Sequence, residues 1–202
     1  MRRFSVTAGS VAGIVLGALV LAWPRIRDAD ASVSIPVTFE DLVQRASAAV
    51  VVTPLEQYGV WEDGRIATYT HVRVERRVAG RLTGEVWVRS EGGSVGNIGQ
   101  LVEGEAAFAM GKASLVFLHP HGGSASATTF GVVEGAQGQF PIVTLGRASP
   151  RLVASPSLGG ILPSSSTQPL ARDILVDVSL EEAATAIAAA WSHWHSAGQG
   201  AR

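Results

Sequence analysis

The feature that most constrains the fold is a sustained alternation of side-chain character from Arg65 to Arg77. The even positions from 66 to 74 hold isoleucine, threonine or valine, and the odd positions from 69 to 77 hold tyrosine, histidine, arginine or glutamate. Successive side chains of a β-strand point to opposite faces, so this pattern predicts one long strand with an apolar and a polar face. Asp63-Gly64, just before it, is typical of a two-residue hairpin turn.

The residues before that turn should pair with the long strand. The run AVVVTPL at 49–55 is rich in β-branched residues, and its Pro54 predicts an edge position or a strand end. Three further segments and a possible fourth read as strands: Glu85–Ser90, Ala113–His119, Phe130–Val133 and Gln139–Val143. Short strands at this spacing predict a mainly β fold, either a barrel or a sandwich.

The glycines predict where this regular structure breaks. Glu91–Gly99 is rich in glycine and predicts an irregular loop whose residues need positive φ or a close backbone approach. Leu101–Phe108 reads either as a short strand or as an irregular crossing. Residues 146–172 contain four prolines and the run Ser164–Thr167, so a long loop or a mobile linker is expected there.

Two helices are predicted at the ends of the domain. Thr38 is a plausible cap for a short helix over Thr38–Ala48. Ser179-Leu180-Glu181-Glu182 forms a capping box after a predicted edge strand at Ile174–Val178. The helix that follows has one apolar stripe, formed by Leu180, Ala184, Ile187, Trp191 and Trp194. We expect this stripe to pack over one barrel opening, with Trp191 as its anchor, because the polar face carries no lysine or arginine for a membrane surface.

The N-terminus has the features of a targeting segment. Arg2 and Arg3 precede eighteen uncharged residues, Val6–Trp23, and Ala29-Asp30-Ala31 offers small residues for cleavage after Ala31. An uncleaved single-pass anchor is the alternative, since eighteen helical residues nearly cross a hydrocarbon core of about 30 Å. Either way we expect an exported chain in the periplasm, cell envelope or medium, touching a membrane only through this segment. The expected organisation is therefore 1–31 signal peptide, 32–145 barrel, 146–172 loop and 173–197 edge strand plus helix.

Charge and cysteine content exclude several function classes. The chain has no cysteine, which rules out disulfides, thiolate zinc sites, iron–sulfur clusters and covalently attached haem. Residues 1–31 contain four of the 16 basic and two of the 17 acidic residues, so cleavage leaves 12 and 15 and a net charge of −3. That balance gives no attraction for nucleic acid, which we do not expect as a partner. No cofactor is implied by any motif.

Several segments over about residues 36–143 resemble a family of exported bacterial proteins of unknown function. The resemblance is carried by Thr38–Val43 with Ala46, Val50–Val52, Thr68–Arg77 with Ala79-Gly80, Val86–Arg89, the glycine loop, Gly111 with Leu115–Leu118, and Ala136–Phe140. The order of elements is also similar to the OB-type barrel of netrin-like domains, which include the tissue inhibitors of metalloproteinases. Those inhibitors bind the protease zinc through a disulfide-bonded N-terminal cysteine, which this chain lacks, so the resemblance implies an OB-like antiparallel barrel and no inhibitory residues.

Two patterns would point to catalysis or to a metal. Gly92-Gly93-Ser94-Val95-Gly96 satisfies the G-x-S-x-G pattern of a nucleophile elbow, but no helix start follows Gly96 and no parallel sheet is predicted. His119 and His121 lie two apart on an extended segment, so both rings point the same way, yet no third ligand is near in sequence. His193 and His195 are also two apart but on a helix, where they point in nearly opposite directions.

The polar face of the second and third strands is the main candidate for ligand binding. Tyr69, His71, Arg73, Trp87 and Arg89 should lie together there, and OB barrels often bind extended ligands on this face by aromatic stacking beside basic groups. The alternative is a cross-strand ladder that covers the barrel wall. We therefore expect a non-catalytic binding module for an extended ligand or a secreted protein. The alternatives are an inhibitor or companion of a secreted metalloprotease, a structural envelope protein, and a hydrolase or metal enzyme that uses Ser94 or His119/His121.

Overall fold

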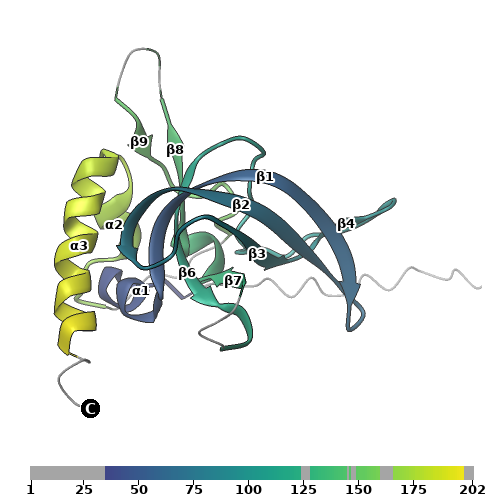
Figure 1. Ribbon diagram of the computed structural model, residues 1–202, viewed down its shortest axis with the longest axis horizontal. Helices are drawn as coiled ribbons and strands as arrows, with labels where there is room; N and C mark the ends of the chain where they lie inside the picture. The colour runs from purple at the N-terminus through teal and green to yellow at the C-terminus, as the bar shows by residue number, and fades with distance from the viewer. Residues whose placement is uncertain (1–34, 124–127, 145, 147–148, 160–165, 198–202) are drawn as a thin grey trace, which may run out of the picture. The chain divides into compact units, whose positions relative to one another are not determined.

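The computed structural model describes residues 35–123, 128–144, 146, 149–159 and 166–197 (Figure 1). The predicted signal peptide or anchor at 1–31 lies outside these residues. The elements are α1 (Phe39–Arg45), β1 (Ala48–Glu62), β2 (Arg65–Gly80), β3 (Glu85–Glu91), β4 (Gly93–Val95), β5 (Ile98–Gln100), β6 (Ser114–Pro120), η1 (His121–Gly123), β7 (Thr129–Val132), η2 (Gly135–Gly138), β8 (Gln139–Val143), β9 (Arg151–Leu152), α2 (Ala171–Leu175) and α3 (Leu180–Ala197).

The fold is mainly β, and five of its strands form a partly closed, OB-like ring. In the described part of the chain the main sheet has the order β1-β2-β3-β7-β6-β8-β9, and β1 also pairs with β6. The ring is therefore β1-β2-β3-β7-β6-β1. Its weakest junction is β3 with β7, which has only two residue pairs and is parallel. The sheet is mixed for this reason, although every other pairing in it is antiparallel, as expected.

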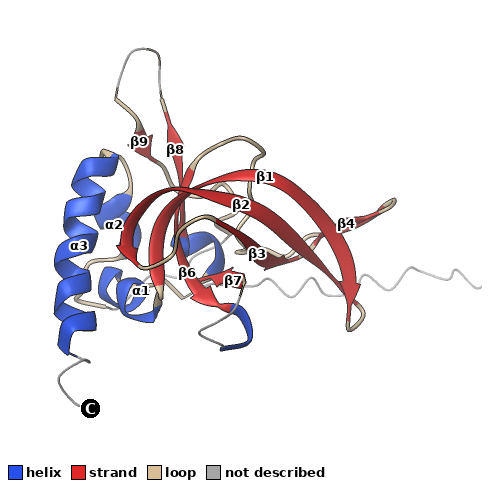
Figure 2. Cartoon of the chain, in the orientation of Figure 1, coloured by secondary structure: helices blue, strands red, loops and turns tan. Residues whose placement is uncertain are grey.

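The long hairpin predicted from the alternation is present and sets the register of the ring (Figure 2). Glu62 pairs with Arg65 across the turn, where Asp63 and Gly64 both have positive φ. β1 continues through Pro54, which lies beyond the last residue pair between β1 and β6, at Val52. Among the strands that the structure describes, none pairs with the second edge of β1 at that point, which confirms the edge position predicted from the proline.

β1 and β6 are buried on both faces and divide the interior into two cores. Val50, Val52, Val116 and Leu118 face the inside of the ring with residues of β2, β3 and β7. The intervening residues of both strands, such as Phe117, face outward into a second core shared with α1, α2 and α3. Continuous apolar runs are the expected pattern of such two-sided strands.

The C-terminal helix packs together with α1 and α2 into the core on the outer side of β1 and β6, not over a barrel opening as the sequence suggested (Figure 1). Since this outer side is apolar, it is the surface that needs a helical cover. Ile187 is fully buried, whereas Trp191 is only half-buried and stacks on His195 with ring centroids 3.8 Å apart. Ile187 is thus the more deeply packed residue of the predicted stripe, and the expectation that Trp191 anchors the helix is corrected accordingly.

Both predicted helix starts are confirmed by their caps. The Thr38 hydroxyl accepts a hydrogen bond from the Asp41 amide (3.1 Å) at the start of α1. At the start of α3 the Ser179 amide donates to Glu182 Oε2 (2.8 Å), and the Glu182 amide donates to Ser179 Oγ (3.3 Å). This reciprocal pair is the capping box that the sequence predicts.

The glycine-rich stretch is more regular than expected. β4 and β5 form a small antiparallel hairpin around Gly96-Asn97. The predicted need for positive φ and close approach is confirmed: Gly93 has φ +115°, and a Cβ placed on it would overlap the Thr68 hydroxyl. Gly59 of β1 likewise has no room for a Cβ because the backbone carbonyl of Ser94 lies against it. The hairpin therefore lies directly on β1 and β2.

Two further expectations near the C-terminus are wrong. Residues 146–172 are not only loop, since Leu152 of β9 is fully buried and β9 pairs with β8 at the sheet edge. The edge strand expected at Ile174–Val178 does not form: its first two residues belong to α2, and only Asp177 and Val178 hydrogen-bond to the backbone of Leu152 in β9. α2 starts where the Leu170 amide donates to Asp173 Oδ2 (3.3 Å). That short local contact favours a helical turn over an extended strand. Among the described helices, none is long and apolar enough to cross a membrane.

Candidate functional site

The five residues predicted to bind ligand lie together on the outer face of β2 and β3. The register places Tyr69 opposite Arg89, His71 opposite Trp87 and Arg73 opposite Glu85. His71 and Trp87 stack with ring centroids 4.6 Å apart. The structure thus brings the predicted set into one surface, which we call the outer aromatic face.

Tyr58 of β1 also belongs to this face, although it was not predicted from the sequence. Its ring stacks on Tyr69 at 5.7 Å and meets Trp87 edge-on at 5.3 Å. The available signal was the two-residue turn, because counting outward from Glu62 and Arg65 places Tyr58 opposite Tyr69. Its side chain is also the most open of the aromatic group, with 49% of the residue exposed.

Most charged groups on the outer aromatic face form hydrogen bonds or ion pairs with one another. Arg89 donates to Glu62 Oε2 (2.9 Å) and Glu91 Oε1 (2.8 Å), and the Tyr69 hydroxyl donates to Glu62 Oε1 (2.6 Å). The hydrogen bond from Tyr69, followed by that from Arg89, lowers the pKa of Glu62. Burial works against the charge of Arg89, but its hydrogen bonds to Glu91 and Glu62 raise its pKa.

His71 also lies close to carboxylates of the same face. Its Nδ1 lies 3.4 Å from Glu56 and its Nε2 lies 3.4 Å from Glu85, which is also 3.3 Å from Arg73 Nε. A basic group that is already paired with a carboxylate binds an anionic ligand less strongly. The geometry therefore favours a cross-strand ladder as the role of this face, with Tyr58 as its most accessible ring.

The opposite face of the same strands lines a large groove. The inner groove, as we call it, has a volume of about 790 Å³. It lies between the inner faces of β2 and β3, the β4–β5 hairpin, and the two wall segments 101–108 and 156–159. Its volume falls in the range of about 300–1,000 Å³ that is typical of small-ligand sites. No motif in the sequence pointed to it, because its residues come from five separate segments.

The floor of the inner groove carries two hydroxyl groups without a protein partner. Thr70 is 1% exposed and Ser90 is 8% exposed, and both line the groove. Within the described part of the chain, neither hydroxyl hydrogen-bonds to another protein group, whereas neighbouring Thr68 donates to the Gly92 carbonyl (2.7 Å). Among these residues no side-chain oxygen or nitrogen is fully enclosed without a partner, so both hydroxyl oxygens keep a small exposed area, and both residues line the groove.

One wall of the inner groove is held by the amide of Gln139. This side chain is 1% exposed; its Oε1 accepts from the Ala107 amide (3.1 Å) and the Ser155 hydroxyl (3.1 Å), and its Nε2 donates to the Ala107 carbonyl (2.8 Å). Gln139 thereby pairs with the backbone of the 101–108 segment as a strand would. Leu101–Phe108 is an irregular crossing in consequence, one of the two alternatives that its sequence left open.

The wall segment 101–108 brings two carboxylates, Glu103 and Glu105, to the inner groove, and the described lining residues include no lysine or arginine. Glu91 also borders the groove, but its carboxylate is bound to Arg89 on the outer aromatic face. Burial raises the pKa of Glu105, while a hydrogen bond from the Glu91 amide to Glu105 Oε2 (3.2 Å) acts in the opposite direction.

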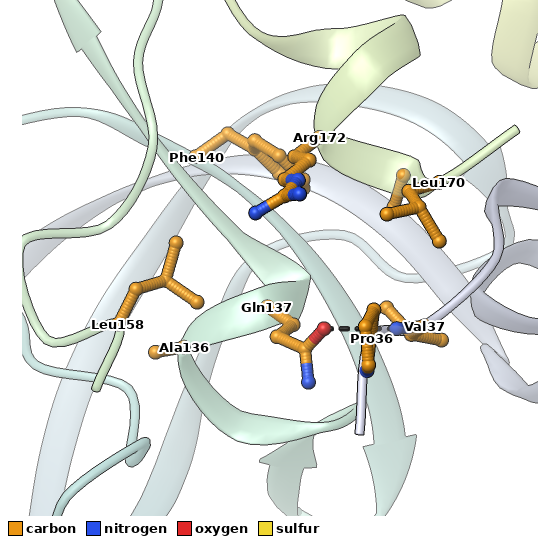
Figure 3. A pocket seen from close by; sticks show the side chains of 9 residues that line it. Pro36, Val37, Ala136, Gln137, Phe140, Leu158, Leu170 and Arg172 are labelled. Atoms are coloured by element: carbon orange, nitrogen blue, oxygen red, sulfur yellow. Dashed lines mark hydrogen bonds between the residues drawn. The ribbon is translucent and has the colours of Figure 1, made fainter. Parts of the chain in front are cut away.

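A second pocket is too small to be a ligand site. Its volume is about 10 Å³, room for about one water molecule, and Val37, Phe140 and Leu158 are among its lining residues (Figure 3). Gln137 borders it and accepts from the Val37 amide (2.9 Å) while donating to the Ile35 carbonyl (2.9 Å). The two glutamines of the Ala136–Phe140 motif therefore each hold a separate backbone segment by hydrogen bonds.

The alternative catalytic and metal residues do not converge. Ser94 is exposed in β4, and a turn and a strand follow it where a nucleophile elbow needs a helix. His119 Nδ1 lies 3.2 Å from the Pro120 carbonyl, and His121 is exposed in η1. In the described residues, no cluster of three or more histidine, aspartate or glutamate side chains is placed to hold a metal. His195 Nε2 lies 3.1 Å from the Val43 carbonyl, in contact with α1.

No protein-family model matches this chain, and no curated protein matches it significantly. Of the two faces of β2 and β3, the outer one is occupied by its own cross-strand contacts and the inner one has space and unpaired hydroxyl groups.

Proposed function

We propose that this chain is an exported, non-catalytic binding protein whose ligand occupies the inner groove. The observation that carries the proposal is the pair of buried hydroxyls, Thr70 and Ser90, that face a groove of about 790 Å³ and have no protein partner among the described residues. Buried polar groups are nearly always hydrogen-bonded in folded proteins. Hydroxyls that lack protein partners are therefore suited to bind a polar ligand, with water in its place when the ligand is absent.

In this proposal the outer aromatic face has a supporting role. Tyr69 and His71 alternate with Thr68 and Thr70 along β2, and Arg89 adjoins Ser90 along β3. The stacked rings and ion pairs on one face fix the strand register that positions the hydroxyls on the other. Rigid strands hold a binding surface with less entropy loss than a loop would, which favours affinity.

The proposal of binding without catalysis is supported by the surroundings of these hydroxyls. A serine or threonine nucleophile needs a base within hydrogen-bonding distance. Neither Thr70 nor Ser90 makes such a contact among the described residues. Export is supported by the N-terminal pattern of Arg2-Arg3, the uncharged Val6–Trp23 and the small residues before position 32.

A single dye on the groove rim tests this function. Because the chain has no cysteine, Leu101→Cys, at a residue that is 88% exposed on the rim, creates one labelling site for an environment-sensitive fluorophore. We expect the dye to respond saturably to at least one of three probes: spermidine, maltotriose and citrate. Thr70→Val should weaken that response, since it keeps the shape and removes the hydroxyl.

The matched control carries the dye at Ser192→Cys on the exposed side of α3. It should show no response to the same probes. If no probe changes the rim dye, or if Thr70→Val leaves the response unchanged, the inner groove is not the ligand site.

A second candidate keeps ligand binding on the outer aromatic face, which the 49% exposure of Tyr58 favours. Exposed aromatic rings can stack on planar or sugar-like ligands. In this case Tyr58→Ser would abolish binding and Thr70→Val would leave it intact. The two variants thus separate the two faces.

A further inference from the structure

We propose that the inner groove selects an organic cation, either a free polyamine or the lysine or arginine side chain of a peptide. This inference rests on the proposed function and names the chemistry of its ligand. The groove combines carboxylates, unpaired hydroxyls and space for a molecule much larger than an ion.

The charges around the inner groove are unbalanced toward negative. Glu103 and Glu105 line it, and the lining residues that the structure describes include no lysine or arginine. The nearby guanidinium of Arg89 is shared between Glu91 (2.8 Å) and Glu62 (2.8 Å). Because Glu62 and Glu91 share that guanidinium on the outer face, Glu103 and Glu105 are left without a basic partner among the described residues, and they give the groove a negative field. Such a field concentrates positive ligands in a cleft with low-dielectric walls.

The hydrogen-bonding groups of the groove also fit a cation. An ammonium group has three donors and no acceptor, and a guanidinium has five donors and no acceptor. Ionised carboxylates only accept, and the hydroxyl oxygens of Thr70 and Ser90 each have lone pairs free to accept. Hydrogen bonds of this charge-assisted kind are about twice as strong as neutral ones.

Size and ligand geometry favour an organic cation over a metal ion. A cleft of about 790 Å³ is far larger than a metal site requires. In the described part of the chain, no group of three or more acidic or histidine side chains is arranged to coordinate a metal. The apolar Phe108 and Leu158, which also line the groove, suit the methylene chain of a polyamine or of a lysine or arginine side chain.

The test is calorimetric titration of the full-length chain in mild detergent. The probes are spermidine, an acetylated hexapeptide of alternating serine and lysine, the same peptide with glutamate for lysine, maltotriose and citrate. We expect saturable binding of spermidine or the lysine peptide, weakened by added salt, and none of the glutamate peptide or citrate. The preferred cation identifies the source of the positive group.

The key variant is Glu105→Gln, which removes the charge and keeps an oxygen to accept from the Glu91 amide. It should weaken cation binding by about tenfold, in line with the loss of a charge-assisted hydrogen bond. The matched control is Glu75→Gln, an exposed carboxylate of β2 that does not line the groove, and it should leave affinity unchanged.

Three results would overturn the inference. Equal cation binding by wild type, Glu105→Gln and Glu75→Gln would show attraction to the general surface. Binding of maltotriose or citrate that depends on Thr70, without cation binding, would reject the cation and retain the groove as a binding site. If no probe binds and the dye on the groove rim responds to none of them, both the cation ligand and the groove as a binding site would be rejected.

Discussion

Replacing Gln139 by leucine should loosen the wall of the inner groove before the rest of the domain. The substitution nearly conserves volume, so it leaves little cavity, but it removes three hydrogen bonds: two with the Ala107 backbone and one with Ser155. At about 0.5–1.5 kcal/mol each, and with the Ala107 groups left without partners, the loss should be roughly 2–4 kcal/mol. That is a large part of a typical total stability of about 5–15 kcal/mol.

Urea denaturation and amide hydrogen exchange measure the two halves of this prediction. The unfolding midpoint of Gln139→Leu should fall with an unchanged slope, and the Ala107 amide should exchange much faster than amides in α3. Ser155→Ala, which removes one of the three bonds, should cost about 1 kcal/mol. Gln168→Leu makes the same substitution at an exposed residue and should change stability by less than about 0.5 kcal/mol.

Equal stability of Gln139→Leu and Gln168→Leu would refute this prediction. It would also fail if Gln139→Leu unfolded more easily while the Ala107 amide kept its protection relative to α3. In the first case the three hydrogen bonds would make no net contribution to the free energy of unfolding. In the second, Gln139 would stabilise the sheet without holding the groove wall.

Three further predictions test other parts of the structure. Ile187→Ala should lower the free energy of unfolding by about 2–5 kcal/mol because this side chain of α3 is fully buried, and a change below about 1 kcal/mol in thermal unfolding would contradict the helix packing. Gly93→Ala should destabilise clearly, since alanine at φ +115° is strained and its Cβ would overlap the Thr68 hydroxyl; a melting temperature equal to wild type would rule out the close approach of the β4–β5 hairpin. The pKa of Glu62 is lowered by the hydroxyl of Tyr69, so its contribution to stability should be present at neutral pH and lost as the pH falls below about 4; urea unfolding of Glu62→Gln should differ from wild type at pH 7 and converge with it in acid.

Local patterns in the sequence were enough to predict the long hairpin, the ring strands and the two capped helices. The alternation in β2 and the Asp63-Gly64 turn set the register, and Ser179 with Glu182 marks the start of α3. These features depend on residues that are close together in the sequence, so they can be recognised from the sequence alone. The continuous apolar runs of β1 and β6 were interpreted as strands, but their second buried face, which packs into a core with the three helices, was not recognised.

The inner groove could not be predicted in the same way, because it depends on contacts between distant segments. Gln139 holds the backbone of Ala107, a residue 32 positions away, and nothing local to a polar residue in an apolar strand indicates that partner. Thr70 was read only as a residue of the apolar face, since its unpaired hydroxyl is apparent only once the groove is formed. The prediction of an edge strand at Ile174–Val178 was wrong for a local reason, because the hydrogen bond between Leu170 and Asp173 starts a helix instead.

The most direct test of the central claim is to map ligand-induced shifts in the amide NMR spectrum of the full-length chain. Spermidine, maltotriose and citrate are added separately to isotope-labelled protein in detergent. We predict that at least one probe shifts the signals of Thr70, Ser90 and residues 101–108, while the signals of Tyr58 and α3 stay unchanged. Shifts centred on Tyr58 and Trp87, or no shift at the groove with any probe, would contradict this prediction.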